Sequence, residues 1–200
     1  MKWIGLTGNI GAGKSTVSKI LKEEGYSVVD ADTIAHQCLD KSTNTFDQIV
    51  NKFGSKILNH NGEIDRKELG KIIFSDSSMR EWLEKIIHPF VQSEVLKLKD
   101  QFNKDGHEMA FYEVPLLFEK NLENQFDSVL VVWVSDLIQK QRLLSRNNWS
   151  PSEINIRNES QWPIQKKIER ANFSINNDGS IEQLRSKIKE VINQLKITNS

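Results

Sequence analysis

Several features that define other protein classes are scarce or missing in this sequence. Cys38 is the single cysteine among 200 residues, which excludes an intramolecular disulfide and a cysteine-rich metal site. We expect Cys38 to pack as a small buried apolar side chain. No apolar run approaches the roughly 20 residues that cross a bilayer, and the stretch Trp3–Leu6 is too short for a signal peptide. We therefore expect a cytoplasmic protein without a membrane partner.

An excess of charge of either sign is also missing. Lys and Arg together number 27, as do Asp and Glu, so the formal net charge is zero. Because such a chain has no long-range field to attract a polyanion, we expect no nucleic-acid partner. No heptad or long apolar surface stripe stands out, which leaves a monomer and a small homo-oligomer both open. Hydrophobic residues make up 38% of the chain, enough for a sizeable core.

Strand and helix patterns alternate at both ends of the chain. Residues 2–7 form a short apolar run, and after a glycine-rich loop apolar residues recur at helical spacing as far as Gly25. Alternation of this kind predicts an α/β fold, with a five-stranded parallel sheet covered by helices on both faces. The other predicted strands are residues 26–29, 109–112, 128–134 and 173–175, and the helices between or after them include residues 136–145 and a helix from Ser180.

The middle of the chain, residues 33–101, has helical patterns and no convincing strand. Asp65 and Glu68 form a capping box that predicts the start of a helix. Pro89 interrupts a helical pattern and is expected to kink or end that helix. Later in the chain, helix starts are predicted at Ser150–Pro151, at Pro163, and at the capping box of Ser180 and Gln183.

The most informative motif is Gly8–Ser15, which matches G-x-x-x-x-G-K-S in full. Its glycines allow successive N–H groups to turn inward toward phosphate oxygens, and the following helix adds its positive N-terminal end. Lys14 is long enough to reach the β- and γ-phosphates of a nucleotide, and the Ser15 hydroxyl is a ligand for Mg²⁺. A glycine-rich turn that binds nothing is the alternative. The motif predicts ATP and Mg²⁺ as cofactors.

Charged residues at the ends of the predicted strands suggest chemistry near this loop. Asp32, with Asp30 as a competitor, is placed to accept the proton of an attacking hydroxyl, and the alternative for Asp32 is an N-cap. Glu113 would hold a Mg²⁺-bound water or would simply be a polar strand end. Arg142 and Arg146 share one face of a predicted helix, suited either to phosphates or to solvent.

The class of nucleotide-binding protein follows partly from missing motifs. The sequence has neither the Asn-Lys-x-Asp motif of GTPases nor the Leu-Ser-Gly-Gly signature of transporter ATPases. A compact chain with two helical insertions suits a kinase of small metabolites, in which one insertion binds the acceptor and the other closes over ATP. A nucleotide-dependent switch that transfers phosphate only to water is the alternative class.

Motifs along nearly the whole chain resemble the dephospho-CoA kinase family. Asn9 departs from the family pattern, which commonly has glycine there, as do Asn147-Asn148 and Asn172, where the family commonly has Asp-Gly and Asp. The segments that carry the resemblance are Leu6–Val17, Val29–Asp32, Asp65–Gly70 through Ile73-Phe74, Leu83–Pro89, Pro115–Glu119, Arg142, Arg146, Gln161 and Asn177–Ser180.

The resemblance implies a reaction and a domain plan. The reaction is phosphorylation by ATP of the ribose 3′-hydroxyl of dephospho-CoA, the last step of coenzyme A synthesis. Another small-metabolite or nucleoside monophosphate kinase is the alternative. The implied plan is a P-loop NTPase core of residues 1–32, 107–140 and 171–200, a helical acceptor-binding insertion of residues 33–106, and a lid of residues 141–170.

The resemblance also implies site residues of four kinds. The catalytic residues are Asp32, Lys14 and Arg142, and the metal ligands are Ser15 and Glu113. The ATP-binding residues are Gly11, Ala12, Gly13, Lys14, Ser15, Thr16, Arg142, Arg146 and Asn177. The residues implied to bind the acceptor are Thr7, Gly8, Asp32, Arg66, His88, Pro115 and Leu116.

Overall fold

The computed structural model describes residues 1–147, 154 and 158–197. It divides into two compact units, one formed by Met1–Val29 with Phe102–Ser200 and the other by Asp30–Gln101. The helix start predicted at Ser150–Pro151 lies outside the described residues. No helix in the described part of the chain combines the length and the apolarity needed to cross a membrane.

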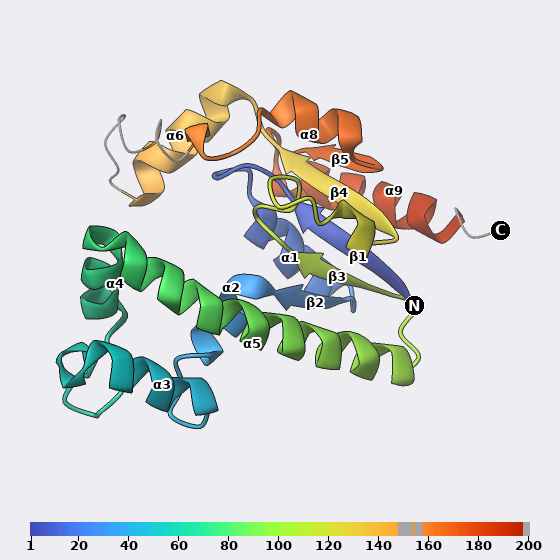
Figure 1. The fold of residues 1–200 in the computed structure, drawn as a ribbon. Coiled ribbons are helices and arrows are strands. Elements are labelled where there is room, and N and C mark those ends of the chain that lie inside the picture. Colours follow the sequence, from blue (N-terminus) through green and yellow to red (C-terminus); the bar gives the residue numbers. More distant parts are fainter. Residues whose placement is uncertain (148–153, 155–157, 198–200) are drawn as a thin grey trace. The chain divides into compact units, whose positions relative to one another are not determined.

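The first unit is built on a five-stranded parallel sheet with the order β2-β3-β1-β4-β5 (Figure 1). Strand β1 pairs in parallel with β3 on one side and with β4 on the other, and β4 pairs with β5. The predicted fold class is therefore confirmed. The strands are β1 (Lys2–Thr7), β2 (Ser27–Asp30), β3 (Met109–Glu113), β4 (Ser128–Trp133) and β5 (Phe173–Asn176).

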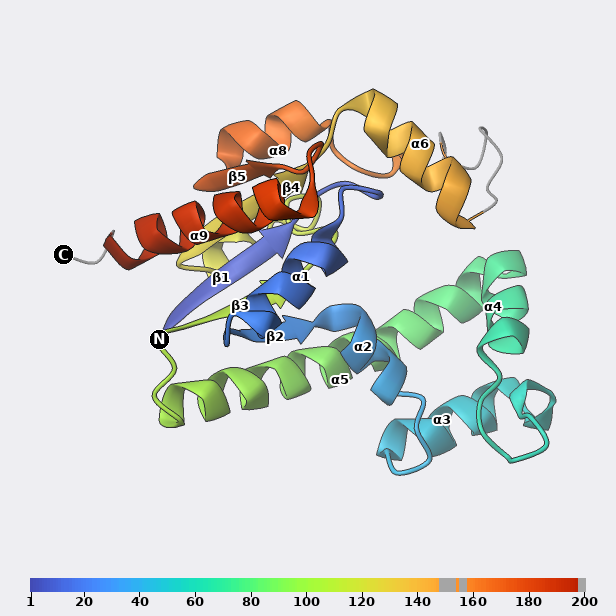
Figure 2. The ribbon, with the colours of Figure 1, turned by 180° about the vertical axis from the view of Figure 1, so that it is seen from behind.

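Helices cover both faces of this sheet. Helices α1 and α9 pack together on one face of the sheet, where they form a first hydrophobic core (Figure 2). Helix α8 packs against β4 on the other face, at a second hydrophobic core. Strand β4 serves both cores because successive side chains point to opposite faces: Leu130 and Val132 join the first core, Val129 and Val131 the second. Within the part of this unit that the structure describes, the α-helices with defined bounds are α1 (Lys14–Glu23), α6 (Asp136–Asn147), α8 (Ile164–Arg170) and α9 (Ile181–Ile197).

The predicted starts of the last two helices are confirmed. Pro163 immediately precedes α8. Ahead of α9, the Ser180 N–H donates to Gln183 Oε1 at 3.0 Å, and the Gln183 N–H donates to Ser180 Oγ at 3.4 Å. These reciprocal bonds are those of a capping box, which satisfies two backbone donors at the helix start.

The second unit is helical, as its sequence pattern predicted. Cys38 is fully buried in its core beside residues such as Ile49 and Ile57, which confirms its expected packing. Asp65 caps α4 by accepting from the N–H groups of Lys67 and Glu68 at 2.8 and 3.3 Å. The helices are α2 (Ala31–Gln37), α3 (Asn44–Phe53), α4 (Arg66–Ser75) and α5 (Ser77–Lys104), the last of which extends to Lys104 beyond this unit.

Helix α5 does not end at Pro89, which excludes one of the two expected outcomes, an end or a kink at the proline. The helix runs from Ser77 to Lys104 with Pro89 inside it. Proline removes one intrahelical hydrogen bond, but apolar contacts on both sides of it are retained, since Ile86, Ile87 and Phe90 all pack on the core of the unit. Burial of this apolar face outweighs the local loss.

Candidate active site

The phosphate loop lies between the end of β1 at Thr7 and the start of α1 at Lys14. Its glycines are needed for steric reasons. Gly8 and Gly13 have φ angles of 151° and 90°, and a Cβ on Gly8 would overlap the carbonyl oxygen of Val132. A Cβ on Gly13 would overlap the side-chain nitrogen of Asn177. The loop therefore closes tightly enough that a methyl group at either position would displace backbone or a neighbouring side chain.

Lys14 folds back over the loop at the N-terminus of α1. Its Nζ donates to the backbone carbonyls of Gly8 at 2.9 Å and Asn9 at 3.4 Å. Ser15 is exposed in the first turn of the helix, which contains no acidic residue. An ammonium group, an exposed hydroxyl and the positive end of a helix thus gather at one place, which suits an anion such as a nucleotide phosphate.

Two residues distant in sequence, Arg142 and Asn177, converge on this loop. Asn177 Nδ2 donates to the Ala12 carbonyl at 2.9 Å, and Arg142 Nη2 donates to the Asn177 carbonyl at 2.8 Å. Arg142 Nη1 also reaches the Ala12 carbonyl at 3.5 Å. The structure therefore brings together four of the predicted ATP-binding residues, Ala12, Gly13, Arg142 and Asn177. Arg146 lies on α6, but its side chain lies outside the described residues.

Asp178 supports this cluster and was not among the predicted site residues. Its carboxylate accepts from the Asn176 side chain at 3.0 Å and from the Ser135 N–H at 2.8 Å. The hydrogen bond from Asn176, followed by those from Ser135 and the charge of Arg142, lowers the pKa of Asp178. In the sequence, Asp178 lies within Asn177–Ser180, one of the segments that resemble the dephospho-CoA kinase family, and this position was what could have indicated its role.

Glu113 ends β3 beside the phosphate-loop strand and is 9% exposed. Ser18 Oγ donates to Glu113 Oε2 at 2.6 Å. Because Ser15 and Ser18 are three residues apart on α1, this bond places Glu113 on the side of the helix that carries Ser15. The two predicted metal ligands therefore lie along the same face of α1.

Predicted acceptor residues of the first unit line up at the carboxyl ends of β1 and β3. Thr7 is fully buried, and its Oγ1 donates to the Pro115 carbonyl at 3.3 Å. The Val114 N–H donates to the Leu6 carbonyl at 2.9 Å, which continues the strand pairing past Glu113. Gly8 and Leu116 directly follow Thr7 and Pro115 in the chain. Ligands of open α/β sheets bind at this edge.

Asp30, the last residue of β2, and Asp32, the second residue of α2, have different roles. Asp30 is the N-cap of α2, since its Oδ1 accepts from the N–H groups of Asp32 at 2.9 Å and Thr33 at 3.3 Å. Asp32 lies in the first turn with an exposed side chain. The alternative in which Asp32 caps the helix is therefore wrong, and its carboxylate remains available for chemistry.

Comparison with known proteins identifies the family. The model of the family "Dephospho-CoA kinase" matches residues 2–183. The chain belongs to the dephospho-CoA kinase family. Dephospho-CoA kinase from Geobacillus kaustophilus is 41% identical over 191 residues, covering 96% of this chain and 95% of that protein.

Solved structures agree with this assignment. Dephospho-CoA kinase from Campylobacter jejuni has a TM-score of 0.74 and 29% identity, covering 99% of this chain and 98% of that one. TT1252 from Thermus thermophilus has a TM-score of 0.78 and 31% identity, with 97% of both chains covered. A shikimate kinase from Bacteroides thetaiotaomicron, with a TM-score of 0.51 and 14% identity, shares the fold.

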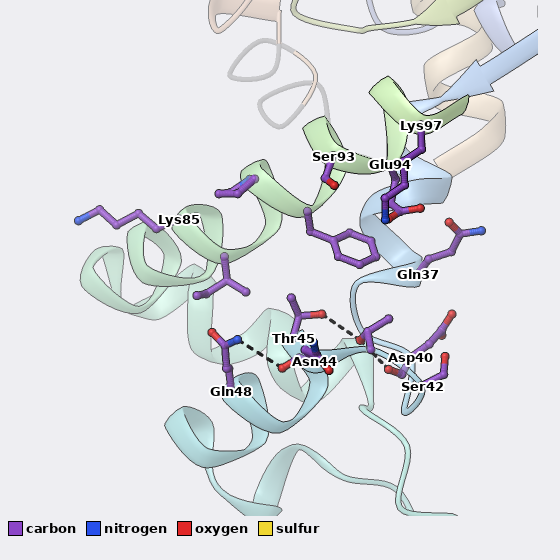
Figure 3. A pocket seen from close by; sticks show the side chains of 14 residues that line it. Gln37, Asp40, Ser42, Asn44, Thr45, Gln48, Lys85, Ser93, Glu94 and Lys97 are labelled. Atoms are coloured by element: carbon purple, nitrogen blue, oxygen red, sulfur yellow. Dashed lines mark hydrogen bonds and ion pairs between the residues drawn. The ribbon is translucent and has the colours of Figure 1, made fainter. Parts of the chain in front are cut away.

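The second unit contains two large pockets, and sequence reasoning found only part of their lining. The first has a volume of about 780 Å³ and lies between α5 and the segment around α3 (Figure 3). It combines two lysines, the two carboxylates of Asp40 and Glu94, and hydroxyl and amide groups with two apolar residues and a proline. Its lining residues include Thr43, Thr45, Gln48, Lys85, Ile86, Pro89, Phe90, Ser93 and Lys97.

The second pocket, of about 880 Å³, is lined by both basic and acidic residues, namely Lys41, Arg66 and Lys67 with Asp40, Glu63 and Asp65. Arg66 is the first residue of α4 and is exposed. His88 is also exposed, on α5 next to Pro89, which lines the first pocket. The recurrence of Lys85, Pro89 and Ser93 every four residues, which places them on one helix face, was the signal in the sequence for the first pocket.

Proposed function

We propose that this member of the dephospho-CoA kinase family transfers the γ-phosphoryl group of ATP to the ribose 3′-hydroxyl of dephospho-CoA, giving coenzyme A and ADP in the last step of its synthesis. The match to the family over residues 2–183 carries the proposal. The convergence of Arg142 and Asn177 on the phosphate loop supports ATP as the donor. Because ATP is supplied in the cytoplasm, we place the enzyme there.

In the proposed reaction, each group of the chain has one task. The loop amides and Lys14 bind the β- and γ-phosphates, and Arg142 neutralises charge that develops on the transferred group. Asp32 orients the 3′-hydroxyl and takes its proton as the oxygen attacks the γ-phosphorus. The bond between the γ-phosphorus and the bridging oxygen breaks, and the electron pair leaves with ADP.

A magnesium ion fits the residues at α1. The exposed Ser15 hydroxyl and the Glu113 carboxylate lie along one face of this helix and are oxygen donors, which Mg²⁺ prefers. Among the described residues there is no cluster of three or more His, Cys, Asp and Glu side chains suited to a metal. A Mg²⁺ ion held mainly by phosphate oxygens and water needs no such cluster, and when bound it supplies positive charge to the phosphates.

The second unit is proposed to bind the acceptor. The lid was expected over residues 141–170, but Ile164 and Ile168 of α8 pack on the core of the sheet and Lys167 is completely buried, so the proposed lid excludes α8. In the first pocket, Lys85 offers a cation for phosphate groups, and Ile86 and Phe90 offer apolar surface. Lys97 lines the same pocket but is paired with Glu94 at 2.6 Å. Arg66 adds a further cation at the second pocket. A nucleotide that carries a long amide-containing arm presents both kinds of surface.

An acceptor panel tests the proposal. Consumption of ATP should depend on dephospho-CoA and should not respond to AMP, CMP or shikimate. Lys14→Ala should fold normally and lose turnover. Stimulation by another acceptor in place of dephospho-CoA would favour the alternative metabolite kinase, and ATP hydrolysis that no acceptor stimulates would favour a regulatory ATPase.

A further inference from the structure

Gln161 and Trp162 form hydrogen bonds with Asn9 and Ile10 of the phosphate loop. Gln161 Oε1 accepts from the Ile10 N–H at 2.9 Å, and Asn9 Nδ2 donates to the Trp162 carbonyl at 3.3 Å. Gln139 of α6 adds a third contact, since its Nε2 donates to the Ile10 carbonyl at 2.8 Å. Both backbone groups of Ile10 are therefore fixed by side chains from other parts of the chain.

Trp162 is itself held by a buried ion pair. Its backbone N–H donates to Glu119 Oε1 at 2.7 Å, and the same oxygen lies 2.8 Å from Lys167 Nζ. The Lys167 side chain is completely buried, and that of Glu119 is 12% exposed. Burying both charges is unfavourable, and apolar residues often replace such a pair without loss of stability. A contribution to stability is therefore a weak explanation for this pair.

The Trp162 ring is fixed by the same region. It stacks on Phe118 with a centroid separation of 6.2 Å, and the Arg170 guanidinium lies 5.4 Å from the indole. Phe118 directly precedes Glu119 and is completely buried. The backbone and the ring of Trp162 thus have little freedom, so the position of Gln161 beside the phosphate loop is set by residues 118–119.

We propose that Glu119 is a positioning residue for nucleotide binding. It acts through Trp162 and Gln161, which keep the loop amides in their binding geometry before the nucleotide arrives. A loop that is already ordered loses less conformational entropy on binding, so the affinity for nucleotide is higher. The inference deepens the proposed function, on which it rests, because it concerns the same nucleotide site.

The contacts that lead from Glu119 through Trp162 and Gln161 to the phosphate loop form a relay, which a matched pair of double variants tests. Glu119→Gln with Lys167→Met removes both charges but keeps a carbonyl acceptor for the Trp162 N–H. Glu119→Leu with Lys167→Met removes the charges and the acceptor. Neither leaves an unpaired buried charge. The readout is the dissociation constant of Mg-ADP by calorimetry, which needs no acceptor, with urea unfolding as the check on stability.

We expect the glutamine double variant to bind Mg-ADP within about 2-fold of the parent, and the leucine double variant to bind about 10-fold more weakly, as the loss of one hydrogen bond predicts. Equal affinities for the two would overturn the relay. A failure to phosphorylate dephospho-CoA with normal Mg-ADP binding in the parent would refute the proposed function and leave this inference standing.

A double-mutant cycle that adds Gln161→Leu to the leucine double variant distinguishes a positioning role of Glu119 from a general loss of protein stability. Gln161→Leu alone should weaken Mg-ADP binding about 10-fold, and adding it to the leucine double variant should cause no further loss, because one relay cannot be broken twice. Losses that multiply to about 100-fold would show independent effects and overturn the proposal. If both double variants fail to fold, an unchanged dissociation constant in Gln161→Leu is sufficient to overturn it.

Discussion

Arg142 donates a hydrogen bond of 2.8 Å to the backbone carbonyl of Asn177, whose own side chain donates to Ala12 of the phosphate loop. These two bonds join the chain at Ala12, Arg142 and Asn177, although Ala12 and Asn177 are 165 residues apart in the sequence. The backbone of Asn177 is anchored in turn, because its N–H donates to the Trp133 carbonyl at 2.8 Å. Position 177 therefore links the end of the sheet to the nucleotide loop.

Removing the Asn177 side chain should weaken nucleotide binding. In Asn177→Ala, the bond to the Ala12 carbonyl is lost, and we expect KM for ATP to rise about 10-fold. Steady-state kinetics at saturating acceptor measure this, with Lys166→Ala as the control because Lys166 is exposed on α8. A KM for ATP unchanged in Asn177→Ala would contradict the assignment of this residue.

Two glycines with nearly the same backbone angle form a matched pair. Gly13 has φ of 90° and Gly25 has φ of 88°, but a Cβ meets the Asn177 side chain at Gly13 and nothing within 4 Å at Gly25. Both alanine variants should lose about 1–2 kcal/mol of unfolding free energy from backbone strain. Only Gly13→Ala should also lose nucleotide affinity, as Mg-ADP calorimetry would measure. Equal affinities in the two variants would show that the close contact at Gly13 is unimportant.

Pro89→Ala should stabilise the second unit and disturb its pocket. The change restores one helical N–H inside α5, so we expect the free energy of unfolding in urea to rise by about 1–3 kcal/mol. Because Pro89 lines the pocket proposed for the acceptor, KM for dephospho-CoA should rise while KM for ATP stays constant. A variant with lower stability would show that the proline suits this helix.

The lowered pKa of Asp178 predicts how acid affects stability. A carboxyl whose pKa is lower in the folded state stabilises the fold above its unfolded pKa, and that contribution is lost as pH falls through the folded value. The difference in unfolding free energy between the parent and Asp178→Asn should therefore be largest near neutral pH and shrink below about pH 4. A difference that stays constant from neutral pH into the acid range would contradict this.

Local signals in the sequence predicted much of the fold and of the nucleotide loop. The caps at Asp65 and at Ser180 with Gln183 use side chains within three residues of their targets, so sequence spacing revealed them. Gly8–Ser15 is equally local. The division of labour between Asp30 and Asp32 was left open, because both residues suit a helix start and only the observed bonds distinguish them.

The parts that were missed depend on contacts between distant segments. Glu119 meets Trp162 and Lys167 more than forty residues away, and Lys167 in isolation is typical of an exposed helical lysine. Whether α5 would kink or end at Pro89 was left open for a similar reason, since tertiary burial of the flanking apolar residues decides whether a helix continues past a local helix breaker. Such effects have no signature in residue spacing.

Asp47 is a matched control for a substitution at Asp32. Asp32 and Asp47 are both exposed aspartates in the first turn of a helix of the second unit. As the proposed general base, Asp32 should lose at least about 100-fold in kcat when changed to asparagine. Asp47→Asn should change kcat by less than about 2-fold, since it only alters a surface charge at a helix end. Similar rates in both variants would remove Asp32 from the mechanism.

The account as a whole is tested most directly by the position of the new phosphate. Purified enzyme, Mg-ATP and dephospho-CoA are incubated together, and the product is examined by phosphorus and proton nuclear magnetic resonance. The account predicts a monoester phosphate on the ribose 3′-oxygen, formed one for one with ADP. ADP formed with inorganic phosphate and unchanged dephospho-CoA, or a phosphate on any other oxygen, would contradict it.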